Sequence, residues 1–436
     1  MQPITIFWHR RDLRLNDNTG LYHALQNEAP VLPLFIFDTQ ILDKLEDKKD
    51  KRLQFIHDHL TQIQKQLNDL KSSLLIKHGN PIDIWKDLLK NYDIQAVYTN
   101  RDYEPYAQER DKKVYELLQK HSIPFKGYKD HVIFDKNEVL KKDGKPYTVF
   151  TPYSKIWKAN LQDVHLQGHP TQKHFSNFFK TKPLTIPSLE DLGFQPIPTN
   201  FPASTPKASI IEQYAEQRNF PSFQSTSRLG VHLRFGTISI RELAKNTKQK
   251  SEVFLNELIW RDFYHMILYH FPHTATSAFK PQYNNIPWRN NETEFKAWCE
   301  GKTGYPIVDA GMRELNETGF MHNRVRMITA SFLTKHLLIN WQWGEAYFAQ
   351  KLLDFDLAAN NGGWQWAASS GCDAAPYFRI FNPTTQLQKF DKQLVYVKKW
   401  ISEWGTDAYP QPIVDHKFAR QRAIDTYKEA LATSKK

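Results

Sequence analysis

The stretch 256–264 places a carboxylate and a guanidinium among aromatic side chains. Glu257, Trp260, Arg261 and Tyr264 recur three or four residues apart, so in a helix they share one face. Burying a carboxylate on such a face is costly unless it is paired or hydrogen-bonded. The pattern therefore indicates either an internal ion pair or a site in which the Glu257 carboxyl contacts a ligand.

A second stretch, 321–327, reads as the start of a basic helix. Asn323 and Met327 lie four residues apart, with Arg324 and Arg326 beside them. An amide can read a base edge, arginine can bind phosphate, and methionine packs adaptably. A solvated basic helix start would show the same residues, so this stretch alone leaves both interpretations open.

Residues 354–366 crowd two acids, three amides, two glycines and two tryptophans into one short segment. We expect a turn-rich segment in which Gly362 and Gly363 let the backbone approach a ligand closely. Trp364 and Trp366 offer ring faces for stacking or for electron transfer. A plain loop is the alternative, but so dense a cluster favours a binding site.

Several common site types are missing from the sequence. The two cysteines, Cys299 and Cys372, form neither a disulfide framework nor a pair at zinc spacing, and there is no His-Glu-x-x-His, so we expect no metal. A dinucleotide fingerprint does not follow the first apolar run, where residues 9–14 are mostly charged. No signal peptide or bilayer-length apolar run is present, which together with the cysteine usage predicts a cytoplasmic protein that binds no membrane.

The 436-residue chain has a formal net charge of +11, which attracts polyanions but does not distinguish nucleic acid from an anionic membrane. In residues 1–130, short apolar runs alternate with helical patterns, which predicts an α/β domain with a parallel, doubly wound sheet. The proline-rich region 131–206 is expected to be an interdomain linker. Helical patterns dominate residues 207–436, and the last residues, from about 425, are expected to fray.

Longer motifs identify a family. They are residues 8–18 (WHRRDLRLNDN), 226–229 (TSRL) and the region 301–391, which includes 374–383 (AAPYFRIFNP). With these segments the chain resembles the photolyase/cryptochrome family, and within it the class I cyclobutane pyrimidine dimer photolyases. The match runs nearly end to end. It implies that residues 1–130 form an α/β antenna-type domain and that residues 207–436 form a large all-helical domain that binds FAD and carries the catalysis.

The resemblance implies light-driven repair of cyclobutane pyrimidine dimers by a carbon–carbon lyase. Light excites reduced, anionic FAD, one electron passes to a dimer flipped out of the DNA, the cyclobutane ring opens, and the electron returns. Photolyases are among the base-flipping enzymes. The implied partner is DNA containing pyrimidine dimers, and the family habit is a monomer.

The resemblance also assigns roles around FAD. Arg326 and Asp354 match an ion pair beside the isoalloxazine ring, and Asn360 matches the residue facing flavin N5, where an amide can favour the reduced flavin. Gly230 stands where many relatives have Ser, and Cys372 where a relative often has Thr. The expected FAD contacts are Tyr214, Thr226, Ser227, Arg228, Leu229, Gly230, Arg261, Arg326, Asp354, Phe355, Asp356 and Asn360.

For the dimer, the resemblance implies stacking on Trp260 and Trp366 and a hydrogen bond from Glu257 to the pyrimidine edge. The expected catalytic set is Glu257, Trp260, Asn323, Met327, Asn360 and Trp366. The expected DNA contacts are Glu257, Trp260, Asn323, Arg324, Arg379, Gln386 and Lys389, several of them on the phosphate side.

Light capture and flavin reduction have their own matched positions. Trp364, Trp341 and Trp288 match the electron-transfer chain of the family, with Trp364 nearest the flavin, although their spacing alone would favour simple packing. Glu104 matches a position that can contact a second, light-harvesting chromophore. Residues 274–275 lack the Cys-Lys pair of some folate-binding relatives, so a folate, a deazaflavin, another flavin or no antenna all remain open.

Three alternatives are weighed against dimer repair. Plant-type cryptochrome photosensors tend to have Asp and Val where this chain has Asn323 and Met327. Photolyases for (6-4) photoproducts show a histidine pair in that region, where only His322 lies here. A flavoprotein that merely coats DNA would need neither Glu257 nor Asn360.

Overall fold

The computed structural model describes residues 2–198 and 200–433 and divides them into two compact units. Unit 1 comprises Met1–Glu138, Asn160–Pro206 and Arg228–Gln249. Unit 2 comprises Val139–Ala159, Lys207–Ser227 and Lys250–Lys436. These boundaries differ from the expected ones of 1–130, 131–206 and 207–436, because each unit recruits segments that are distant in sequence.

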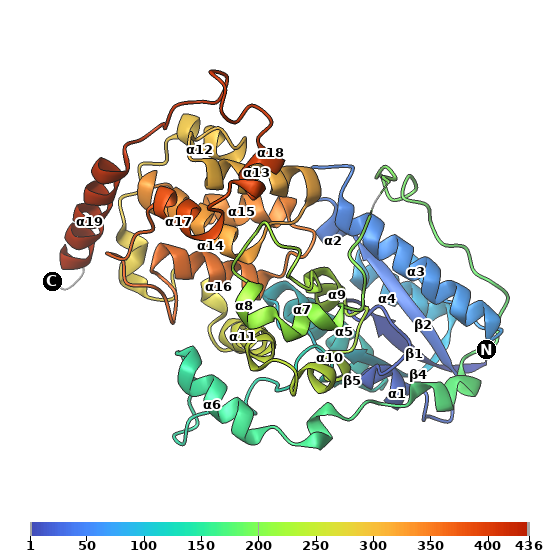
Figure 1. The fold of residues 1–436 in the computed structure, drawn as a ribbon. Helices are drawn as coiled ribbons and strands as arrows, with labels where there is room; N and C mark the ends of the chain where they lie inside the picture. The colour runs from blue at the N-terminus through green and yellow to red at the C-terminus, as the bar shows by residue number, and fades with distance from the viewer. Residues whose placement is uncertain (1, 199, 434–436) are drawn as a thin grey trace. The chain divides into compact units, whose positions relative to one another are not determined.

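Unit 1 is built on a five-stranded parallel sheet with the order β3-β2-β1-β4-β5 (Figure 1). The strands are β1 (Pro3–His9), β2 (Val31–Asp38), β3 (Leu75–Gly79), β4 (Asp93–Asn100) and β5 (Phe125–Tyr128). The helices are α1 (Thr19–Ala24), α2 (Thr39–Leu42), α3 (Lys51–Asp69), α4 (Pro81–Asn91), α5 (Pro105–Gln119), α9 (Gly230–Phe235) and α10 (Ile240–Thr247). The expected doubly wound α/β fold is confirmed.

Successive side chains of β1 point to opposite faces of the sheet, and both faces are covered. Ile4, Ile6 and Trp8 belong to one hydrophobic cluster with residues of α4 and α5. Phe7 points to the other face, where its ring meets Gly20 of α1. A buried parallel strand needs apolar residues on both faces, which accounts for the continuous apolar run.

The proline-rich segment is not a freely spanning linker. Phe178 is buried and bridges Val31 at the start of β2, and the Phe179 N–H donates to the Val31 carbonyl at 2.8 Å. The segment Asn160–Pro206 thus packs on unit 1, because its scattered apolar residues find a place at the sheet. The earlier part, helix α6 (Phe150–Asn160), contributes instead to unit 2, where the Trp157 indole donates to the Asp262 carboxylate at 3.0 Å.

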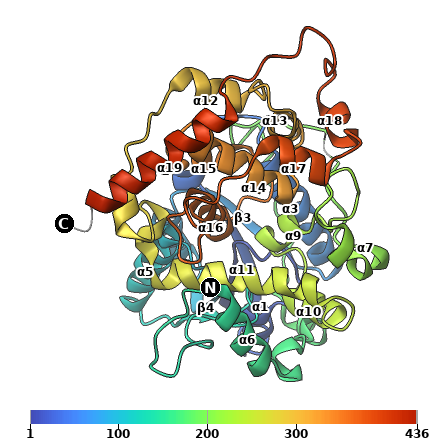
Figure 2. The ribbon, with the colours of Figure 1, turned by 60° about the vertical axis from the view of Figure 1, so that its left-hand side comes forward.

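Unit 2 is helical, as expected. Its helices are α7 (Ala208–Glu212), α8 (Tyr214–Gln217), α11 (Glu252–His270), α12 (Glu292–Cys299), α13 (Pro306–Thr318), α14 (Asn323–Ser331), the π-helical turn η5 (Phe332–His336), α15 (Trp341–Lys351), α16 (Leu357–Ala368), α17 (Pro383–Phe390), α18 (Val395–Trp400) and α19 (His416–Thr433). Helix α16 packs against α11, α14 and α15 and lies among them in Figure 2. Among the described residues the chain does not fray from residue 425: α19 continues to Thr433, and the buried Tyr427 hydroxyl donates to the Ala368 carbonyl at 3.0 Å. The rest of the expectation, at residues 434–436, lies outside the described residues.

No helix in the described part of the chain is both long and apolar enough to cross a bilayer.

Candidate functional site

Residues 354–366 form a helix rather than the expected turn-rich segment. Asp356 caps α16, with its side chain accepting from the Ala359 N–H at 3.3 Å. Gly362 lies inside the helix, where a Cβ would come closer than 3.0 Å to the Tyr264 ring of α11. The glycine therefore serves close packing between two helices, since any side chain would push them apart.

One face of α16 carries three of the predicted site residues. Asn360 and Trp364 follow Asp356 at intervals of four residues, so the three share a face. Next to this face, Arg326 of α14 donates to both oxygens of Asp354, at 3.0 and 3.1 Å. His265 of α11 places its Nε2 3.4 Å from the Asp356 carboxylate. Helices α11, α14 and α16, with the segment just before α16, thus supply a guanidinium, an imidazole, carboxylates and an amide to one region.

These groups have the chemistry that a flavin edge requires, because its carbonyls and ring nitrogens need both donors and acceptors. Arg326 and Asn360 supply donors, and Asp354 and Asp356 supply acceptors. The residues present therefore fit FAD.

The Asn360 amide is already hydrogen-bonded to Glu345, a residue that the sequence analysis did not predict. Its Nδ2 donates to Glu345 Oε1 at 2.8 Å and to the Glu345 carbonyl at 3.1 Å. Burial raises the pKa of Glu345, and the bond from Asn360 opposes that rise. Because both amide hydrogens point at Glu345, an Asn360 that donates to a ligand must first release one of these bonds.

Glu257 forms an ion pair, but with a distant partner. Its carboxylate binds Arg218, which follows α8. The next residue, Asn219, accepts a hydrogen bond from Arg324 of α14 at 2.7 Å. Two consecutive residues thus tie Glu257 on α11 to Arg324 on α14, which brings two of the predicted site stretches together.

The ion pair leaves the Glu257 side chain accessible, and its pKa is raised. The side chains of Arg218 and Glu257 remain 22% and 30% exposed. Burial raises the pKa of Glu257, while the Arg218 guanidinium works against the rise. A carboxyl with a raised pKa is easier to protonate and can then donate a hydrogen bond.

The predicted stacking residue Trp260 contacts two neighbouring aromatic rings. Phe150 stacks on it with ring centroids 3.6 Å apart and planes 3° from parallel, and Tyr264 stacks at 5.4 Å. The Phe150 N–H donates to Asp373 at 3.0 Å, which anchors the stack to the loop that follows Trp366. Trp260 and Trp366 are both partly exposed, as residues that stack on a ligand must be.

Two of the predicted phosphate contacts lie beside one ring. The Arg324 guanidinium lies 4.5 Å from the Phe390 centroid and the Lys389 ammonium 5.3 Å from it. Asn323, the first residue of α14, is exposed, as are Arg379 and Lys389, whereas Gln386 on α17 and Met327 on α14 are half-buried. Of these residues, Arg324 is linked to Glu257 through Asn219 and Arg218, and Lys389 lies by the same Phe390 ring as Arg324.

The three predicted electron-transfer tryptophans belong to one packed region. Trp364 and Trp341 are buried in the same hydrophobic cluster, and Trp288 packs against it while partly exposed. Trp364 also contacts Trp298 and Phe348, with centroids 6.0 and 5.0 Å away. Their order from buried to exposed fits a path from the interior to the surface.

The predicted FAD residues from Tyr214 to Gly230 divide between the two units. Tyr214, Thr226 and Ser227 belong to unit 2, whereas Arg228, Leu229 and Gly230 belong to unit 1. The Arg218 guanidinium lies 5.2 Å from the Tyr214 ring centroid. Arg261, on α11, and Phe355, just before α16, are both half-buried in unit 2.

Glu104, the predicted antenna contact, lies in unit 1 just before α5. Its carboxylate accepts from Arg11 at 2.9 Å and pairs with Arg234 at 2.9 Å. A chromophore that contacts Glu104 has to share that carboxylate with two cations.

Two family models match the chain: DNA photolyase over residues 5–173 and FAD binding domain of DNA photolyase over residues 254–406. The deoxyribodipyrimidine photo-lyases of a Synechococcus species and of Escherichia coli are each 37% identical to it over 98% of this chain and 97% and 98% of their own lengths. This chain belongs to the DNA photolyase family.

Solved structures agree with that assignment. A class III photolyase from Agrobacterium tumefaciens gives a TM-score of 0.87 at 32% identity, covering 99% of this chain and 98% of that one. An archaeal photolyase from Sulfolobus tokodaii with two FAD molecules gives 0.84 at 34% identity, covering 98% and 100%. A Synechocystis cryptochrome, 24% identical with a TM-score of 0.82 over 97% and 99% of the two chains, shares the fold.

Sequence reasoning missed several residues that this photolyase-family site depends on. Arg218 and Asn219 follow a helix of four residues with no usable periodicity. Glu345 gives no signal of its own on α15. Phe150 lay in the segment assigned to the linker. Only pairing in three dimensions, which no local pattern encodes, identifies these partners.

Proposed function

We propose that this protein uses light to split cyclobutane pyrimidine dimers in DNA, with reduced FAD as its cofactor. The observation that carries the proposal is the accessible Glu257 carboxyl, linked through Arg218 and Asn219 to Arg324. A protein that only bound flavin would not need a buried but reachable acid on the same surface as phosphate-binding cations.

The roles of the residues follow from their contacts. Trp260, braced by Phe150, and Trp366 provide stacking faces for the flipped bases. Glu257 donates a hydrogen bond to a pyrimidine carbonyl, which its raised pKa favours. Arg324 and Lys389 hold phosphate on the surface beside them. When bound, FAD supplies the electron for ring opening, and Arg326, Asp354 and Asn360 orient its ring.

The deciding experiment is repair of a thymine-dimer oligonucleotide by the purified, FAD-reduced protein under blue light. We expect light-dependent loss of the dimer, none in the dark, and none for a (6-4) oligonucleotide. Glu257→Ala should slow repair with FAD retained, whereas Glu252→Ala, on the exposed start of the same helix, should repair normally. Repair of neither lesion by a protein whose FAD photoreduces normally would instead indicate a cryptochrome photosensor.

The proposal extends to assembly and location. We infer a monomer that acts in the cytoplasm on DNA containing pyrimidine dimers. Support comes from the formal net charge of +11 and from the two cysteines, which are both unpaired thiols. Sedimentation of the holoprotein with and without DNA tests the monomer.

A further inference from the structure

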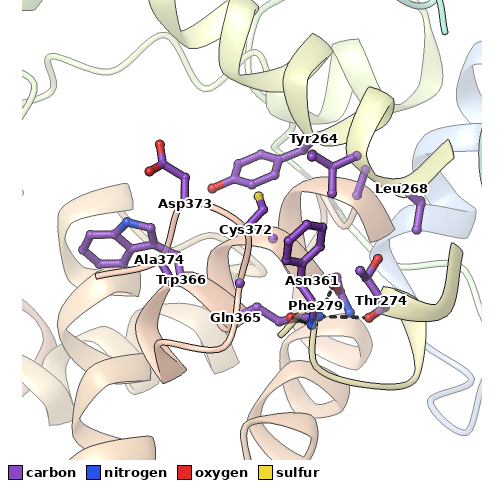
Figure 3. Close-up of a pocket in the computed structure, with 14 residues that line it drawn as sticks. Tyr264, Leu268, Thr274, Phe279, Asn361, Gln365, Trp366, Cys372, Asp373 and Ala374 are labelled. Atoms are coloured by element: carbon purple, nitrogen blue, oxygen red, sulfur yellow. Dashed lines mark hydrogen bonds between the residues drawn. The ribbon is translucent and has the colours of Figure 1, made fainter. Parts of the chain in front are cut away.

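A buried polar network in unit 2 connects α13 with three helices that pack against it, α14, α17 and α18. Its centre is Glu314 of α13, which is 3% exposed and whose Oε2 accepts from the Tyr396 hydroxyl of α18 at 2.6 Å. Burying a carboxylate is costly unless it is hydrogen-bonded, and Tyr396 supplies such a bond from a side chain that is itself buried. The network is separate from the pocket between α11, α16 and the loop 371–374 (Figure 3), because it shares none of the residues that line that pocket.

One end of the network fixes the start of α14. Glu314 Oε2 also accepts from the His322 N–H at 3.4 Å. His322 caps the helix, with its Nδ1 accepting from the Arg324 N–H at 3.2 Å. Because a backbone N–H can only donate, this Nδ1 carries no proton, and the cap requires the neutral imidazole. Helix α13 thus determines where the first turn of α14 lies, and Arg324 belongs to that turn.

The other end of the network fixes the end of α17. Asp391 directly follows this helix, and its carboxylate accepts from the Tyr396 N–H at 3.1 Å and from the Val397 N–H at 3.0 Å. Burial raises the pKa of Asp391, and the N–H donors of α18 oppose the rise. Tyr396 is therefore bonded to the end of α17 through its backbone and to α13 through its hydroxyl.

The two helix ends carry cations that are predicted to bind phosphate. Arg324 and Lys389 lie by the ring of Phe390, the last residue of α17. Burial and the nearby Arg218 guanidinium lower the pKa of Arg324. In the described part of the chain, Arg324 pairs with no carboxylate: it donates to the neutral Asn219 amide, and its Nε has no hydrogen-bond partner. A half-buried cation without a counter-charge favours an anionic ligand.

We propose that Tyr396 and Glu314 are positioning residues for DNA binding. They hold the start of α14 and the end of α17 in a fixed relation, so that Arg324 and Lys389 bind the phosphate backbone together. Neither positioning residue contacts DNA itself, since both side chains are buried. Cations that are already in place lose less conformational freedom on binding, so a buried hydrogen bond changes affinity at the surface. The inference rests on the proposed function in that the ligand is DNA.

The test is a double-mutant cycle on the FAD-loaded protein. Affinity for a thymine-dimer oligonucleotide is measured by fluorescence anisotropy at several salt concentrations. Tyr396→Phe removes the hydroxyl and keeps the ring, and should weaken binding roughly three- to tenfold, within the range of coupling between residues of one network. It should also reduce the slope of log affinity against log salt toward that of Arg324→Ala. In protein that already carries Arg324→Ala and Lys389→Ala, Tyr396→Phe should change affinity by less than about twofold.

Two controls separate positioning from a general loss of stability. Tyr305→Phe removes the hydroxyl of another buried tyrosine of unit 2, which donates to the Val414 carbonyl at 2.7 Å, and should leave affinity and salt slope unchanged. His322→Ala should weaken binding by removing the cap of α14, whereas His322→Asn should restore most of it, because asparagine is a strong helix cap. The flavin absorbance of each purified variant reports whether FAD is retained.

Unchanged affinity in Tyr396→Phe would overturn the proposal. So would an equal loss of affinity with and without the Arg324 and Lys389 side chains, because Tyr396 would then act by another route. If Tyr396→Phe does not retain FAD, His322→Ala decides, and wild-type affinity in that variant would overturn the proposal. Wild-type protein that binds the oligonucleotide without repairing it would refute the proposed function alone, whereas wild-type protein that binds no DNA would refute both.

Discussion

Two adjacent glycines of α16 should respond in opposite directions to the same substitution. A Cβ at Gly363 would meet nothing within 4 Å, whereas a Cβ at Gly362 would come closer than 3.0 Å to the Tyr264 ring. Gly363→Ala should stabilise the fold by about 0.5–1 kcal/mol, because alanine loses less backbone entropy in a helix. Gly362→Ala gains the same intrinsic term but must displace a ring that is stacked against Trp260.

The size of the difference can be worked out because the helix-propensity term is common to both variants and cancels. What remains is the overpacking at Gly362, which costs about 1–3 kcal/mol. For a cooperative unit of about 150–250 residues this corresponds to a separation in Tm of roughly 2–12 °C, at 2–4 °C per kcal/mol. Far-UV circular dichroism with thermal or denaturant unfolding measures it.

A second assay connects packing with function. Movement of Tyr264 shifts Trp260, so Gly362→Ala should weaken binding to a thymine-dimer oligonucleotide more than Gly363→Ala does. Equal unfolding midpoints for the two variants, or a more stable Gly362→Ala, would refute the close approach of α11 and α16 as the reason for this glycine.

Three other predictions concern electrons, protons and salt. Trp364→Phe should block photoreduction of oxidised FAD while sparing repair by pre-reduced protein, and unchanged photoreduction would remove Trp364 from the path. Arg218→Met should raise the pKa of Glu257 further, because burial then acts unopposed. The Glu257 carboxyl would then stay protonated up to a higher pH. A ¹³C NMR titration of Glu257 with an unchanged midpoint would contradict this. Lys389→Ala should reduce the slope of log affinity for DNA against log salt by about one, and an unaltered slope would show that Lys389 contacts no phosphate.

The sequence predicted elements well where burial imposes a simple period. Four strands of unit 1 appear as short apolar runs because they are covered on both faces. Strand β5 (Phe125–Tyr128) was missed, since Lys126 and Gly127 interrupt its pattern and it is defined by pairing with β4. Helix α16 was expected as turns because its glycines have low helix propensity, yet tertiary packing against α11, α14 and α15 overrides that preference.

The site was predictable in its chemistry but not in its pairings. Helical spacing placed Glu257 and Trp260 on one face, and the internal ion pair considered for Glu257 exists. Its partner is Arg218, 39 positions earlier, and no periodicity links the two residues. Similarly, Asn360 was assigned a role toward a ligand, but its hydrogen bonds to Glu345 depend on how α15 lies against α16.

Close contact with a glycine positions an aromatic ring on each side of α16. A Cβ at Gly344 of α15 would come closer than 3.0 Å to Trp364, just as one at Gly362 would collide with Tyr264. Each aromatic ring therefore lies in close contact with a glycine, whose missing side chain leaves space for the ring; at Gly344 the Leu333 side chain shares that space. Electron transfer and base stacking both depend on distance and orientation, so two glycines, residues of low helix propensity, determine the geometry on which the proposed function relies.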